Sequence, residues 1–76
     1  MPKRPLTERI GSVCRQCREE DEITLTHFAK KMGKSKGQLS RLESGLQGFS
    51  ISVLYDYSRL LGKSVSELVV RAEGLK

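Results

Sequence analysis

Apolar residues recur along the chain at the three- and four-residue spacing of amphipathic helices. They form five separate stripes, and no segment alternates with the two-residue period of a strand for long enough to predict one. The stripes are Ile10, Val13, Cys14 and Cys17; Leu25, Phe28, Ala29 and Met32; Leu39 and Leu42; Ile51, Leu54, Ser58 and Leu61; and Val65, Leu68, Val69 and Ala72. The pattern therefore predicts an all-α fold of five short helices with polar connections.

Capping residues and glycines mark where these helices begin and end. The predicted N-caps are Thr7, Thr24, Ser35, Ser50 and Ser64, and the predicted ends are Gly33, Gly45, Gly62 and Gly74. Capping boxes are predicted at Ser35 with Gln38 and at Ser64 with Glu67. Tyr55 and Tyr57 are expected to cover the edge of the core on the fourth helix. These boundaries leave residues 1–6 as a basic N-terminal arm and residues 7–76 as one domain.

The chain is too short for a second core, because it has 76 residues, of which 37% are hydrophobic and 30% are charged. Its apolar runs are too short to predict a membrane span or a signal peptide. A single His on so small a chain predicts a binding protein rather than an enzyme, with no cofactor and no small-molecule ligand. Two cysteines three residues apart form no disulfide framework, which favours the reducing cytoplasm.

The formal net charge of +5 is unevenly distributed along the chain. Residues 30–43 carry five Lys and Arg against one Glu, residues 1–18 carry the same balance, and residues 19–22 are four consecutive acids. The basic segment in mid-chain predicts a positive face suited to phosphates. A solvated face that only keeps a small protein soluble is the alternative, so the charge alone does not decide the function.

The segment between the second and third predicted helices is the most informative. Gly33 ends one helix and Ser35 begins the next, and so short a turn makes the two helices cross steeply and touch. Ala29 is small enough to permit that contact, while Leu39 and Leu42 fix the third helix on the core. The other sides of the third helix then carry hydrogen-bonding groups and no acid: Lys36, Gln38, Arg41 and Ser44.

Residues 23–45, ITLTHFAKKMGKSKGQLSRLESG, resemble the helix-turn-helix of the Cro and phage-repressor superfamily, also called XRE-type. The resemblance rests on the spacing of Ala29, Gly33, Leu39, Leu42, Glu43 and Gly45. It continues upstream through Ile10, Gly11 and Arg18 and downstream to Leu68, and so covers about residues 7–70. It implies a compact five-helix domain of the lambda-repressor type, in which the second and third helices form the helix-turn-helix.

The resemblance also implies a function. In this family the third helix lies in the major groove of duplex DNA and dimers read palindromic half-sites, which implies a sequence-specific transcriptional regulator, a repressor and homodimer, located at the nucleoid when bound to DNA. By position, the base-contact candidates are Lys36, Gly37, Gln38 and Arg41, and the phosphate-contact candidates are Leu25, Thr26, Lys34, Ser44 and Ser50. The family pairs an Arg with a Glu at the positions of Arg18 and Glu43, which implies a partly buried ion pair between the first helix and the third.

Three positions depart from the family pattern. Leu25 stands where a Gln is usual, so one phosphate-positioning side chain is missing and Thr26 or a nearby Lys is expected to replace it. Lys34 replaces a small apolar residue of the turn, and its ammonium is expected to point outward toward DNA. Phe49 stands where a Pro is common.

Apolar residues outside the stripes predict the surface through which the chain dimerises. These dimer-interface candidates are Leu46, Phe49, Val70 and Leu75, which would cover one another across a two-fold axis. The alternative is that Leu46 and Phe49 fold back on the fourth helix.

Other functions are weighed against these. Cys14 and Cys17 form a C-x-x-C, but zinc needs four ligands and His27 is the one further soft candidate, so the cysteines are interpreted as core residues and no metal is expected. His27 is interpreted as a surface residue, with a phosphate contact as the alternative. The acids of residues 19–22 are expected to face away from DNA.

Two alternatives to a DNA-binding regulator remain. One is a protein-interaction module, such as an antitoxin or adaptor, and the other is a thiol-based redox sensor.

Overall fold

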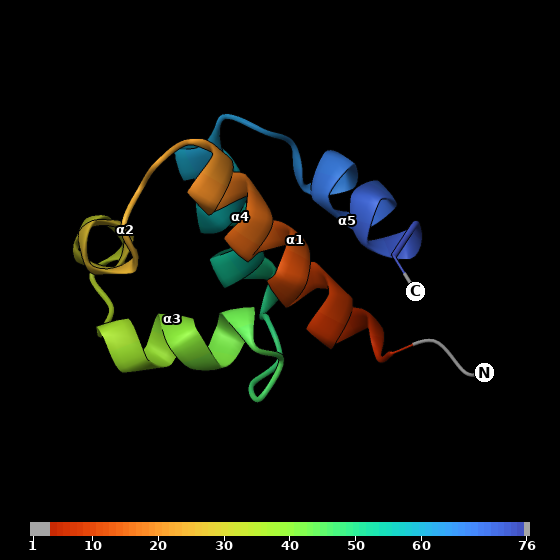
Figure 1. The fold of residues 1–76 in the computed structure, drawn as a ribbon, viewed down its shortest axis with the longest axis horizontal. Helices are drawn as coiled ribbons and strands as arrows, with labels where there is room; N and C mark the ends of the chain where they lie inside the picture. Colours follow the sequence, from red (N-terminus) through yellow and green to blue (C-terminus); the bar gives the residue numbers. More distant parts are fainter. Residues whose placement is uncertain (1–3, 76) are drawn as a thin grey trace.

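The structure of the protein, a computed structural model, describes residues 4–75, which contain five helices joined by short connections (Figure 1). These are α1 (Leu6–Glu20), α2 (Leu25–Met32), α3 (Lys36–Glu43), α4 (Ile51–Leu61) and α5 (Val65–Glu73). Within the described residues there is no strand, so the predicted all-α fold of five helices is confirmed. None of these helices is long and apolar enough to cross a membrane.

The core lies around α1, which contacts α3, α4 and α5, while α2 packs on α3 (Figure 1). Its buried apolar residues are Ile10, Val13, Cys14, Cys17, Phe28, Ala29, Leu39, Leu42, Leu54, Tyr57, Leu61, Leu68 and Ala72. All five predicted stripes therefore contribute to one core. Ile51 is the exception among their members, since 81% of its surface is exposed. It is the first residue of α4.

Two further predictions about single residues are wrong. Tyr57 does not cover the edge of the core but is fully buried within it, with its ring centroid 4.7 Å from that of Phe28, whereas Tyr55 is exposed. α1 begins at Leu6 with Pro5 in the N-cap position, so Thr7 lies inside the first turn and is not the cap. Proline suits this place because its fixed φ fits the start of a helix and its carbonyl still accepts, here from the N–H groups of Glu8 and Arg9.

The other predicted caps form. The hydroxyls of Thr24, Ser35, Ser50 and Ser64 each accept the backbone N–H three residues further on. The box at Ser35 is complete, because the Gln38 side chain also accepts from the backbone N–H of Ser35. At Ser64 the first half of the box is present, but the Glu67 carboxylate lies 3.1 Å from the Arg71 guanidinium.

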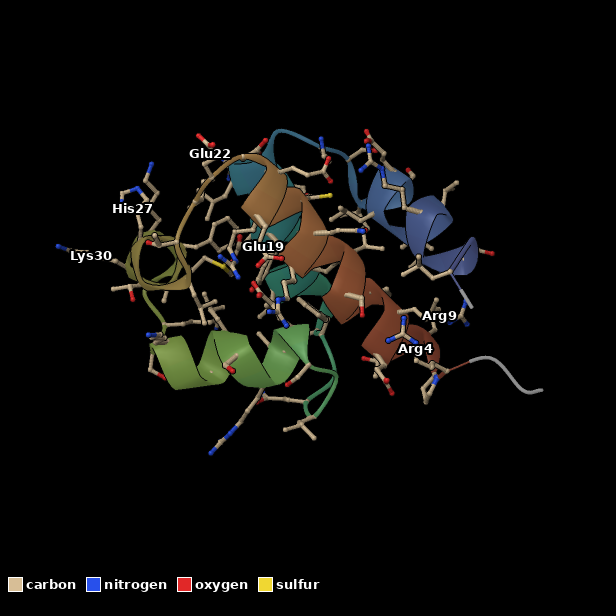
Figure 2. All side chains as sticks on the ribbon, viewed as in Figure 1. Arg4, Arg9, Glu19, Glu22, His27 and Lys30 are labelled. Atoms are coloured by element: carbon tan, nitrogen blue, oxygen red, sulfur yellow. The ribbon has the colours of Figure 1, made fainter. Side chains whose placement is uncertain are left out.

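The N-terminal segment is held where it meets α1. Arg9 donates from Nε to the carbonyl of Arg4 at 2.8 Å and from Nη1 to the carbonyl of Ala72 at 3.1 Å, which joins this segment to the end of α5 (Figure 2). Arg4 lies 3.6 Å from Glu8 and donates to Ser12. Residues 1–3 of the predicted arm lie outside the described part of the chain.

Candidate nucleic-acid interface

The turn between α2 and α3 has the geometry that its sequence predicts. Gly33 adopts the left-handed conformation with φ 68°, where residues with a Cβ are disfavoured. The N–H of Lys34 bonds to the carbonyl of Ala29 at 3.0 Å, and Ser35 begins α3 immediately afterwards. Ala29 and Leu39 are both buried in the core, and α2 packs on α3. The turn therefore positions α3 against α2.

One side of α3 faces the core and the rest is open to solvent. Leu39, Leu42 and Glu43 are buried, whereas the remaining residues of the helix and its C-cap are exposed: Lys36, Gly37, Gln38, Ser40, Arg41 and Ser44. The exposed set contains two cations and no acid. An outward face of this kind offers donors to nucleic-acid bases and phosphates without repelling them.

The base-contact candidates are not equally free. Lys36 and Arg41 are exposed, and Gly37 has open space around the position of a Cβ. The Oε1 atom of Gln38 already accepts from the N–H of Ser35 at 2.8 Å, which leaves its amide NH₂ for another partner. Gln38 therefore has a structural role in addition to the proposed contact.

The phosphate-contact candidates lie on both sides of α3 along the chain. Leu25 and Thr26 form the first turn of α2, where Leu25 packs its side chain on the core and offers its backbone N–H. Ser50 caps α4, and Lys34 is half-buried in the turn. Ser44 is exposed, and its hydroxyl donates to the carbonyl of Ser40 at 2.7 Å.

A buried network fixes the far side of α3. Arg18 of α1 donates from Nε and Nη2 to the two carboxylate oxygens of Glu43 at 2.9 Å each, and from Nη1 to the carbonyl of Ile23 at 2.7 Å. The Tyr57 hydroxyl of α4 donates to the same carboxylate at 2.9 Å. The hydrogen bonds to Glu43 raise the pKa of Arg18, and burial together with the charge of Glu43 raises the pKa of Tyr57. The network thus joins α1, α3 and α4.

Two polar residues that lie beside α3, Tyr57 and Arg15, were not predicted from the sequence. Tyr57 is the third member of the network, and its place on the buried face of α4, between the stripe residues Leu54 and Leu61, was the available signal. Arg15 lines a groove of about 180 Å³ together with Ser40 and Ser44, which places a cation of α1 beside α3. No sequence pattern pointed to this arginine.

The dimer-interface candidates are not brought together. Phe49 packs edge-on against Tyr57, with ring centroids 5.3 Å apart, and Leu75 also packs on the core. Leu46 and Val70 remain exposed, at 81% and 66% of their surfaces, but one lies in the α3–α4 loop and the other on α5, which are on different sides of α1 (Figure 1). Of the four candidates, two therefore remain exposed, and they lie on separate parts of the molecule.

Both cysteines lie in the core, in agreement with their interpretation as packing residues. Burial raises the pKa of Cys14 to about 12 and also raises the pKa of Cys17. A thiol reacts as its thiolate, so these pKa values disfavour redox sensing at neutral pH. Among residues 4–75, no cluster of three or more His, Cys, Asp or Glu is arranged to hold a metal ion.

The labelled charged residues of the α1–α2 connection and of α2 lie away from the exposed face of α3. Figure 2 shows Glu22 on the side of the molecule opposite α3, in the connection between α1 and α2. His27 and Lys30 point outward from α2, and His27 is exposed as expected. Glu22 is therefore separated from the face that carries Lys36 and Arg41, whereas Glu8 and Glu19 of α1 line a groove that also includes Ser44.

The fold and this face define a helix-turn-helix domain, with α3 in the position of the recognition helix. A family model for the XRE-type helix-turn-helix, HTH_3, matches residues 15–68, and the chain belongs to this family. Two solved crystal structures of the clp gene regulator ClgR from Corynebacterium glutamicum are similar, each with 33% sequence identity over 96% of this chain. One gives a TM-score of 0.92 over 78% of its own length, and the other a TM-score of 0.90 over 94%. No curated protein matches the chain significantly.

Proposed function

We propose that the protein is a sequence-specific DNA-binding transcription regulator that represses its target as a homodimer on palindromic half-sites. The observation that carries the proposal is the exposed face of α3, which is basic, free of acids and positioned by the turn at Gly33 and the network at Glu43. Membership of the helix-turn-helix family and the similarity to a clp gene regulator support it.

The proposal assigns roles to the exposed residues. α3 enters the major groove, where Arg41 and Lys36 donate to guanine and the amide NH₂ of Gln38 donates to a base acceptor. Gly37 permits close approach of the backbone. The first turns of α2 and α4 bind phosphates on either side, through Leu25 and Thr26 N–H groups and the region of Ser50, with Lys34 and Ser44 beside them.

The dimer is proposed because one eight-residue recognition helix reads too few base pairs to find a single site in a genome. A two-fold pair doubles the site and places the half-sites about 34–36 Å apart, one turn of DNA. Of the four candidates, Val70 on α5 is the one that is both exposed and on a helix away from α3. We therefore place the subunit contact on α5.

The test is to select bound duplexes from a random pool and to measure affinity for the selected sequence over a range of salt concentrations. Arg41→Ala should weaken specific binding by about 1–3 kcal/mol and relax preference at one base position. Arg59→Ala is the matched control, since Arg59 is an exposed arginine of α4 that lies over the Tyr55 ring. Equal losses for both variants, or equal loss of Arg41→Ala on every sequence, would refute base reading by Arg41.

The oligomeric state is tested separately by sedimentation at micromolar concentration, with and without the selected duplex. The wild type should be dimeric at least on DNA, and Val70→Asp should dissociate it. A wild type that stays monomeric in both conditions would refute the dimer.

Repression is tested with a reporter gene whose promoter carries the selected site. Expression should decrease when the protein is present, and increased expression would show an activator instead.

A further inference from the structure

The connection between α3 and α4 presents one apolar side chain to solvent at a fixed position. Leu46 is 81% exposed, although neighbouring Phe49 packs on the core. Gly45 and Gly48 lie against the start of α1: a Cβ on Gly45 would come within 2.6–2.8 Å of Glu8 atoms, and one on Gly48 would lie 3.5 Å from the Thr7 hydroxyl. Leu46 and Gln47 stand between these two contacts and are both exposed, so they form the outward tip of the loop.

The backbone of Leu46 is tied to the recognition helix at Arg41. The N–H of Leu46 bonds to the Arg41 carbonyl at 2.9 Å, and the N–H of Gly45 bonds to the Leu42 carbonyl at 3.3 Å. With Gly45 at φ 79°, these bonds form a Schellman motif, which ends a helix in one defined geometry. Leu46 therefore stays beside the helical turn that carries Arg41.

The usual apolar partner of this leucine is absent. In a Schellman motif the residue at the position of Leu46 commonly packs on an apolar side chain at the position that Arg41 occupies here. Here that position is occupied by Arg41, whose side chain is charged and exposed. Four-fifths of the Leu46 surface is therefore exposed to solvent. Figure 1 shows the loop on the same side of the domain as α3 and away from α5. A ligand that reaches the exposed side of Arg41 is thus close to Leu46.

We propose that Leu46 makes an apolar contact with duplex DNA beside the base pair that Arg41 reads. The apolar carbon surface that a duplex offers there is a thymine methyl group or the carbons of a deoxyribose. This inference rests on the proposed DNA-binding function and adds a residue to its interface. It reassigns Leu46 from the subunit contact, which the separation of the loop from α5 also favours.

The experiment compares Leu46→Asn, Leu46→Ala and Leu46→Met on the duplex selected by the wild type. Asn has nearly the shape of Leu without its apolar character, so Leu46→Asn should bind about tenfold more weakly, and Leu46→Ala should lose a similar factor. Leu46→Met keeps the apolar surface and should bind within about twofold of the wild type. Because no counterion is released by an apolar contact, the dependence of affinity on salt should be unchanged in all three variants.

Two controls separate this contact from other causes. Leu60→Asn makes the same change on α4, beside Asp56 and Arg59, and should bind DNA like the wild type. Thermal unfolding should show Leu46→Asn to be as stable as the wild type, since the side chain is exposed. A duplex with uracil in place of thymine removes the methyl groups: a vanishing Leu46 effect assigns the contact to a methyl, and a retained effect assigns it to deoxyribose.

Several outcomes would overturn the inference. Wild-type affinity of Leu46→Asn, or an equal loss in Leu46→Asn and Leu46→Met, would exclude an apolar DNA contact. Dissociation of the free dimer by Leu46→Asn in sedimentation would assign the residue to a subunit contact. If the wild type itself selects no duplex, the proposed function fails, and that result is distinguishable from the failure of Leu46 alone.

Discussion

Gly11 and Gly37 both lie within helices, but the space around them differs. A Cβ on Gly11 of α1 would lie 2.5 Å from the Leu42 carbonyl oxygen and 2.7 Å from that of Glu43, both backbone atoms of α3. A Cβ on Gly37 of α3 would meet only the Ser35 hydroxyl, at 4.0 Å. Glycine is therefore required at position 11 by the approach of two helices, whereas folding makes no such demand at position 37.

Substitution of Gly11 and of Gly37 by alanine should consequently change the free energy of unfolding in opposite directions. Gly11→Ala should lower the free energy of unfolding by about 1–3 kcal/mol, because backbone must move to admit the methyl group. Gly37→Ala should raise it by about 0.5–1 kcal/mol, because alanine favours the helix. Urea unfolding of both variants provides the measurement. A stabilising Gly11→Ala would show that α1 and α3 can separate at little cost.

The buried side chains of Cys14, Cys17 and Tyr57 make the stability of the fold depend on pH in the alkaline range. Burial raises the pKa of Cys14 from 9.0 to about 12, and burial also raises the pKa of Cys17 and of Tyr57 above their ordinary values of 9.0 and 10.0. The unfolded chain releases the two cysteine protons above about pH 9 and the tyrosine proton above about pH 10, while the folded chain keeps them to higher pH. The folded state thus binds more protons, and stability decreases as pH rises.

Urea unfolding between pH 8 and pH 11 should therefore show full stability at pH 8 and a progressive loss above about pH 9. Each proton held only by the folded state contributes a slope of about 1.4 kcal/mol per pH unit. Cys14→Ala removes one such proton and should give a shallower slope than the wild type. Identical slopes for the two proteins would exclude Cys14 as a source of the alkaline loss.

At the scale of an element, α3 uses Gln38 both for its own start and for its exposed face. The reciprocal bonds of the capping box, at 2.8 Å and 3.1 Å, satisfy two backbone N–H groups that a helix otherwise leaves unpaired. The same side chain is a candidate for base contact. Its structural and DNA-binding roles are separable, because Glu forms the same box.

Gln38→Glu should unfold like the wild type but bind the selected duplex more weakly, since it places a negative charge on the DNA-facing side. Gln38→Ala should reduce stability by about 1 kcal/mol through loss of the box. Thermal unfolding and titration with duplex DNA measure the two effects. Unchanged DNA affinity of Gln38→Glu would remove residue 38 from the interface.

At the scale of the whole molecule, the carboxylate of Glu43 joins three helices that are distant in sequence. Arg18 and Glu43 expose only 8% and 5% of their side chains, and Tyr57 shares the carboxylate. Among residues 4–75, no buried side-chain nitrogen or oxygen lacks a hydrogen-bond partner. The network therefore orients α3 relative to the rest of the domain without leaving a buried polar group unpaired.

Glu43→Ala should destabilise the fold by roughly 3–5 kcal/mol, because Arg18 would remain buried without its counter-ion. Glu19→Ala is the matched control: it breaks the exposed pair with Arg15, 3.6 Å apart, and should cost at most about 0.5 kcal/mol. Both variants are compared by urea unfolding. A Glu43→Ala protein as stable as Glu19→Ala would show that the pair does not hold the helices together.

Local patterns in the sequence were sufficient to predict the five helices, four of their N-caps and the turn at Gly33. Each of these features depends on residues within a few positions of one another: periodic apolar side chains, a hydroxyl before a helix, a glycine after it. For the same reason the sequence predicts which side of α3 is apolar and which side carries Lys36 and Arg41. The resemblance to a known family added the pairing of Arg18 with Glu43.

The tertiary structure decided what depends on contacts between distant elements. Tyr57 is central rather than peripheral because Phe28 and Phe49 meet it from two other segments, and its hydroxyl finds Glu43 across the core. Ile51 is exposed and Phe49 packed because helix packing, not periodicity, determines which apolar residues are covered. Likewise the outward position of Leu46 follows from the seating of Gly45 against α1 at Glu8, a contact between residues far apart in sequence.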